Sequence, residues 1–186
     1  MGTVKRGIEA STTVRIPIER ARQVLTDDPG CVVADAASPD DRRERRFSSA
    51  LGIDLGAGGA VRQAVTVSLG ALSSLDGAAS LPLRWQASGR DRVFPVFEGE
   101  LEARAAGLGA TMLVVRGTYT VPLGAVGRFG DGVIGRRLAQ QSLVSFVEDA
   151  AGRLDREVHR RMAAVSWHPA PYAVDLRETG SENYLG

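Results

Sequence analysis

The spacing of the apolar residues changes once along this chain, and that change restricts the folds open to it. Up to about residue 121, apolar and polar side chains alternate in short stretches, as in strands with one buried face. From about Leu123 to Met162 the spacing becomes helical. The helical face carries Leu143, Val147, Ala150, Leu154 and Val158. The pattern predicts an α+β fold in which strands precede one long amphipathic helix.

Turn-forming residues divide the first part of the chain into short elements. A first strand is expected over Ile8 to Ile16, and Pro17 then permits a short helix over Ile18 to Leu25. Later alternating stretches predict about six strands in a meander, at 47–55, 61–69, 83–87, 97–104 and 113–119 among others. The glycine-rich segments 56–59 and 107–109 are predicted turns, and the charged segment 38–46 a solvated loop.

Twisted antiparallel strands with one apolar face curl, so the long helix should lie across the concave side of the sheet. The glycines at 130–135 are expected to break this helix. With 186 residues, the chain suits one domain, which we place at 1–165. The last segment, 166–186, lacks periodicity and is predicted to be an extended tail.

Composition excludes several classes of function. The 23 basic and 22 acidic side chains nearly cancel, so no global field favours nucleic acid. No apolar stretch approaches the roughly 20 residues of a membrane span, and the N-terminus lacks a signal-peptide core. The lone Cys31 rules out an internal disulfide, and a cytoplasmic location is expected.

No motif for catalysis or cofactor binding stands out. Spacings typical of metal ligands and of phosphate-binding loops are absent from the sequence, and no cofactor is expected. His159 and His168 both lie near the C-terminus, where neither is placed to activate Cys31 or a serine. We therefore assign no catalytic residue and no metal site.

Three segments resemble a known superfamily. They are the stretches 81–85 (LPLRW), 94–101 (FPVFEGEL) and 117–125 (GTYTVPLGA), the last running towards Arg136–Ala139. These segments resemble bacterial members, without assigned activity, of the START and polyketide-cyclase superfamily, also called SRPBCC. The resemblance extends from about Gly7 to Met162. It implies a helix-grip fold, with a curved antiparallel sheet around a long C-terminal helix and a cavity between them for a hydrophobic small molecule.

The inward-facing side chains of the predicted sheet are the candidate ligand contacts. Each could equally be plain core. Gln63 is a polar group in an apolar lining, which indicates either a bond to a ligand or a bulge. Gly99 and Gly117 imply a close approach by the helix or a ligand, or again a bulge. The candidate ligand-binding residues are Gln63, Val65, Trp85, Phe97, Leu101, Val115 and Tyr119.

Three functions remain open from the sequence. The leading hypothesis is binding of a small hydrophobic molecule or lipid without catalysis, because no acid–base pair lies among the inward residues. A second is a cyclase, aromatase or dehydratase that orients its substrate with Tyr119 or Gln63. A third is a protein-interaction module, with a homodimer or protein partner held through the aromatic-containing tail.

Overall fold

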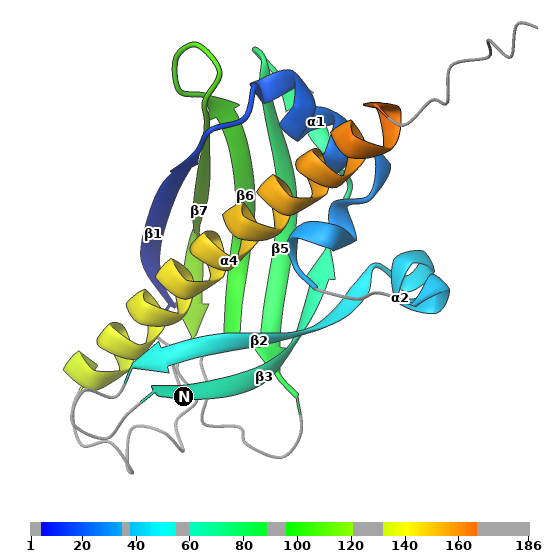
Figure 1. The fold of residues 1–186 in the computed structure, drawn as a ribbon. Coiled ribbons are helices and arrows are strands. Elements are labelled where there is room, and N and C mark those ends of the chain that lie inside the picture. The colour runs from blue at the N-terminus through cyan, green and yellow to red at the C-terminus, as the bar shows by residue number, and fades with distance from the viewer. Residues whose placement is uncertain (1–4, 35–37, 55–59, 89–95, 121–131, 167–186) are drawn as a thin grey trace, which may run out of the picture.

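A seven-stranded antiparallel sheet and one long helix dominate the computed structural model (Figure 1). The structure describes residues 5–34, 38–54, 60–88, 96–120 and 132–166. The strand order is β1-β7-β6-β5-β3-β2, and the short β4 pairs with β5. In chain order the elements are β1 (Lys5–Val14), α1 (Ile18–Asp27), η1 (Pro29–Val32), α2 (Pro39–Glu44), β2 (Arg46–Asp54), β3 (Ala60–Leu69), β4 (Ser73–Leu75), β5 (Ala78–Ala87), β6 (Val96–Ala105), β7 (Thr111–Thr120) and α4 (Gly132–Ser166).

The helix α4 is held at both edges of the curled sheet, whose strands pass behind and beneath it in Figure 1. On one side, the Gln140 side-chain amide donates to the backbone carbonyl of Glu9 in β1, at 3.2 Å. On the other, the backbone N–H of Gly52 in β2 donates to the Ser145 hydroxyl, at 3.1 Å. These bonds satisfy backbone groups that edge strands would otherwise leave unpaired. The helix therefore completes the sheet as well as covering its concave face.

The core lies between this concave face and the helices. Leu25 of α1, Val32 of η1 and Leu154 of α4 are fully buried against the inward residues of the strands. An ion pair joins α1 to α4 at the rim, because the Arg161 guanidinium reaches Asp27 of α1 at 2.6 Å. Arg161 also pairs with Glu157 within α4, at 2.8 Å. Among the described residues, no helix is long and apolar enough to cross a membrane.

The predicted order of strand, short helix, meander and long helix is confirmed. The predicted loop at 38–46 is wrong, because Pro39–Glu44 forms the short helix α2. The Ser38 hydroxyl accepts the Asp41 backbone N–H, and the Asp41 carboxylate accepts the Ser38 N–H. This capping box was present in the sequence as Ser38-Pro39-Asp40-Asp41.

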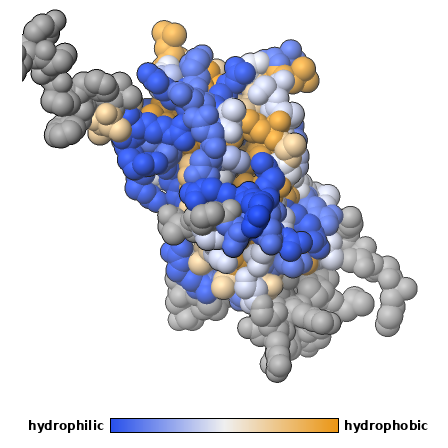
Figure 2. Space-filling model, turned by 90° about the vertical axis from the view of Figure 1, so that its right-hand side faces the viewer, coloured by the Kyte–Doolittle hydropathy of each residue, from blue (hydrophilic) through white to orange (hydrophobic). Residues whose placement is uncertain are grey.

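Figure 2 views the molecule from the side on which α2 lies in Figure 1, and hydrophilic residues cover most of this surface.

Two other predictions concern chain segments at the ends of elements. The turn at Gly107 and Gly109 is confirmed, and both glycines have positive φ angles, of 96° and 74°. The glycine-rich segment 56–59, the first residues of the predicted long helix and the tail after Ser166 lie outside the described residues. Within the described part, α4 continues through Gly135 without a break.

Cys31 should make stability depend on alkaline pH. Burial, with Asp28 and Glu157 nearby, raises the pKa of its thiol from an ordinary value near 9 to about 12. Between these values the unfolded chain loses the thiol proton while the folded chain keeps it, so stability falls as pH rises from about 9 to about 12. Urea titrations of the parent and of Cys31→Ala across this range should show the smaller slope in the variant. Equal slopes would contradict the assignment.

Candidate functional site

Aromatic side chains from several strands and from α4 lie at one level of the interior. Hydrogen-bonded register places four inward residues from β7, β6, β5 and β3 in a single row, and a fifth in β2 completes it. The row is Tyr119, Phe97, Trp85, Val67 and Phe47. The helix α4 adds Phe146 from the opposite side. We call the set Tyr119, Phe97, Trp85, Phe47 and Phe146 the aromatic layer.

The rings at the centre of this layer pack directly on one another. Trp85 stacks on Phe97 with ring centroids 4.1 Å apart and planes 17° from parallel. Trp85 also meets Phe146, with centroids 5.0 Å apart and planes inclined by 35°. Trp85 and Phe97 are each only 2% exposed, and Phe146 is fully buried. The space between sheet and helix is therefore filled by side chains at this level.

The glycine pair beside the layer explains its tight packing. Gly99 and Gly117 face each other in register, where a β-carbon on either would collide with the backbone of the other strand. The Phe97 Cζ lies 2.7 Å from both positions that a β-carbon would take, so its ring covers the glycines. The predicted bulge is wrong, since the register is unbroken. Close approach is confirmed, but the approaching groups are the facing strand and Phe97.

Gln63 lies at the far end of the concave face, where β3 pairs with β2. Its partner across the strands is Leu51, and the register continues unbroken to Asp54, so the bulge alternative is wrong here too. The side chain is half-buried, and its amide donates to the neighbouring Ala64 carbonyl at 3.0 Å. The bond is local, because it joins neighbouring residues of one strand.

The aromatic layer divides the inward positions into two regions of different character. On the side towards α1, Leu101 and Val115 pair in register and are fully buried in the core. On the other side, the row of Ser49, Val65 and Ala87 contains small side chains, and Ser49 and Ala87 are half-buried. Leu101 and Val115 thus belong to the packed core. Val65 is also fully buried, but it lies with Gln63 on the other side of the aromatic layer, in what we call the lower region.

Phe146, Phe47 and Ser49 were not among the predicted site residues. Phe146 lies next to Val147 on the apolar face of the long helix. Its position on that face could have indicated from the sequence that its ring points towards the sheet. The row that joins Phe47 to the other rings depends on strand register across four strand pairs. Residue spacing alone does not specify that register.

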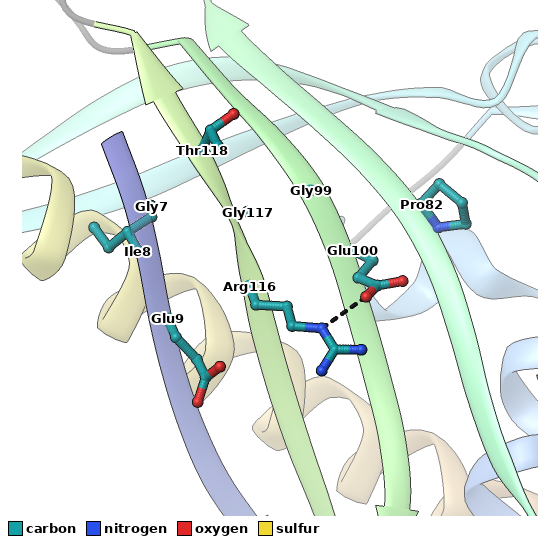
Figure 3. A pocket seen from close by; sticks show the side chains of 9 residues that line it. All are labelled: Gly7, Ile8, Glu9, Pro82, Gly99, Glu100, Arg116, Gly117 and Thr118. Carbon is teal, nitrogen blue, oxygen red and sulfur yellow. Dashed lines mark hydrogen bonds and ion pairs between the residues drawn. The ribbon is translucent and has the colours of Figure 1, made fainter. Parts of the chain in front are cut away.

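A second feature is an open groove of about 720 Å³ on the outer face of the sheet, away from α4 (Figure 3). At its centre, the Arg116 guanidinium bonds Glu100 at 2.7 Å and Glu102 at 3.1 Å. The Ser80 hydroxyl donates to Glu100 at 2.6 Å, and this bond, with that of Arg116, lowers the pKa of the Glu100 carboxyl. These charges satisfy each other, which is typical of a solvated sheet surface.

Among the described residues, no group of three or more His, Cys, Asp or Glu side chains could hold a metal ion. Glu157 is bonded by two arginines and Glu100 by one, so these two carboxylates with lowered pKa serve ion pairs. The pKa of the Asp41 carboxyl is lowered by its hydrogen bonds with Ser38 in the capping box. Within this described part of the chain, the inward side chains of the lower region can offer apolar contact and the Gln63 amide.

Comparison with solved structures identifies the fold. The Zhui aromatase/cyclase from Streptomyces sp. R1128 superimposes with a TM-score of 0.51 and 17% identity, covering 87% of this chain and 98% of that chain. A START superfamily protein from Mycobacterium smegmatis gives a TM-score of 0.44 and 15% identity, covering 86% and 99%. Norcoclaurine synthase from Thalictrum flavum, in complex with dopamine and hydroxybenzaldehyde, gives 0.48 and 15%, covering 83% and 88%.

No protein-family model matches the sequence, and a comparison with curated proteins finds no match. The structural similarity and the strand order together define the chain as a helix-grip protein, with the fold of the START and polyketide-cyclase superfamily. The fold predicted from the three sequence segments is confirmed. At these levels of identity, the similarity concerns the fold and does not assign an activity.

Proposed function

We propose that this protein binds a small hydrophobic molecule between the sheet and α4, in the lower region, against the aromatic layer. The observation that carries the proposal is the change in side-chain size and polarity across that layer. Large aliphatic residues fill the region towards α1, whereas the lower region combines the buried Val65 and Leu51 with smaller or polar side chains that are only half-buried, namely Ser49, Ala87 and Gln63. Apolar walls with few polar groups are typical of sites for small molecules.

The aromatic layer suits a ligand with a flat ring or a rigid hydrocarbon skeleton. Trp85 and Phe97 already stack nearly parallel, so a further ring meets a preformed aromatic surface. The Gln63 amide exchanges its bond to the Ala64 carbonyl for a bond to a ligand oxygen, which orients the molecule. Helix-grip proteins with solved structures include an aromatase/cyclase, and this supports an interior site without naming its ligand.

Native mass spectrometry with extraction of the bound material tests this function. Gently purified protein should carry a discrete extra mass that yields an apolar compound, or should take one up from a panel of fatty acids, sterols and aromatic polyketides. An apo mass with no uptake from the panel would contradict the proposal. A compound released with an altered mass would favour the cyclase-type alternative.

A pair of neighbouring variants locates the site. Ala87→Leu adds bulk on the inward, half-buried side of β5, whereas Gln86→Leu adds an apolar side chain on the exposed outer side. We expect Ala87→Leu to reduce ligand uptake about five- to 150-fold, since overfilling costs about 1–3 kcal/mol. Gln86→Leu should bind like the parent. Equal uptake by both variants would move the ligand away from the lower region.

A further inference from the structure

Two leucines project into solvent from the tips of neighbouring hairpins. Leu75 is 76% exposed at the β4–β5 turn, and Leu108 is 106% exposed at the β6–β7 turn. The turns are shaped by other residues, since Asp76, Gly77, Gly107 and Gly109 have the positive φ angles. Neither leucine is needed for its turn, and neither packs in the core.

The two tips lie at the same end of the sheet. β5 pairs with β6 so that Ala79 faces Ala103, which brings the start of β5 beside the end of β6. Both turns are at the upper end of the sheet in Figure 1. With neighbouring strands roughly 4.8 Å apart, Leu75 and Leu108 stand about 10–15 Å from each other. They are separate protrusions and do not form one patch.

Basic side chains flank the Leu108 tip. Arg15 follows Val14, which pairs with Thr111 at the start of β7, and Arg104 lies at the end of β6. Both arginines are exposed, and the Arg104 side chain extends towards Met112 at 3.4 Å. Asp76 is the acidic residue at the other tip. Figure 2 shows apolar side chains at the upper edge of a surface that is otherwise mostly hydrophilic.

We propose that this end of the molecule docks on a lipid bilayer that contains anionic headgroups, with Leu75 and Leu108 inserted and Arg15 and Arg104 against the headgroups. A protein partner needs a contiguous buried surface of about 800 Å² on each side. Two isolated leucines do not supply it. A bilayer accepts separate protrusions, because each side chain inserts independently and each nearby arginine adds attraction. Binding is therefore peripheral and reversible.

Vesicle sedimentation of the full chain tests the proposal. The parent should bind vesicles of phosphatidylcholine mixed with phosphatidylserine, more weakly at high salt because screening removes the arginine contribution. Leu108→Ser and Leu75→Ser should each reduce partitioning roughly tenfold, in line with the burial of one leucine side chain. Arg15→Gln with Arg104→Gln should reduce binding to the mixed vesicles and leave binding to pure phosphatidylcholine unchanged.

The control is Val144→Ser, which removes an apolar side chain that is 37% exposed on α4, away from both hairpins. It should bind vesicles like the parent, and all these variants should keep the parent's thermal midpoint, since the leucines are exposed. No binding by the parent to mixed vesicles, or binding by Leu108→Ser and Leu75→Ser equal to that of the parent, would overturn the proposal. So would a parent dimer that Leu108→Ser dissociates. Ligand uptake measured without vesicles reports separately on the interior site.

Discussion

Replacing Trp85 by Ala should lower the free energy of unfolding by about 3–5 kcal/mol, the usual loss for a large buried aromatic. Trp85 is 2% exposed and touches Phe97 and Phe146, so its removal breaks the contact between sheet and helix at the aromatic layer. Chemical denaturation followed by far-UV circular dichroism measures the loss without relying on fluorescence of the other tryptophan, Trp167.

Two controls separate packing from other causes. Trp85→Phe keeps an aromatic ring in the stack and should lose less than half as much stability as Trp85→Ala. Adding indole at millimolar concentration should raise the thermal midpoint of Trp85→Ala more than that of the parent, because the variant offers an additional cavity of matching size. A loss below about 1 kcal/mol for Trp85→Ala would show that the layer contributes little to the core.

Replacing Gly117 by Ala should destabilise the fold by about 2–3 kcal/mol, a large effect for one added methyl group. A β-carbon there would collide with the Glu98 carbonyl, and would lie 2.6 Å from the Gly99 Cα and 2.7 Å from the Phe97 ring. The ring could move, but the backbone of β6 cannot move without breaking its pairing with β7. Denaturant titration of the variant measures the effect.

The matched control is Gly7→Ala, on the neighbouring strand β1. A β-carbon at Gly7 has no other atom within 4 Å, and its φ angle is not positive. This variant should be as stable as the parent or slightly more stable, because alanine has less conformational freedom in the unfolded chain. If Gly117→Ala unfolds at the same denaturant concentration as Gly7→Ala, β6 and β7 do not approach as closely as the structure shows.

Much of the fold was predictable because its signals are local. Alternation along 97–104 and 113–119 predicts strands, and the four-residue steps from Leu143 to Val158 predict a helix. Each pattern depends only on neighbours in the chain. The helix α2 was missed because its six residues have no apolar face, although its capping box was readable. The hairpin signal of Asp76-Gly77 was equally local and marks the β4–β5 turn.

The candidate site was only partly predictable. The inward positions of Trp85, Phe97 and Tyr119 follow from alternation within each strand, and the structure buries all three. Alternation assigns a residue to a face but not to a level along the sheet, so it could not separate Leu101 and Val115 from Gln63 and Val65. The bulges considered at the glycine pair and at Gln63 are absent from the register. A bulge depends on how a strand pairs with its partner, and the sequence of one strand does not show that pairing.

The sequence by itself determined the order of elements, the apolar face of each strand and helix, and the need for a helix to cover a curved sheet. Only the tertiary structure decided which inward residues meet. Register between strands distant in the chain aligned Phe47 with Trp85 and Tyr119, and the path of α4 brought Phe146 to them. These contacts arise from packing many side chains at once into one volume, and no local spacing encodes that arrangement.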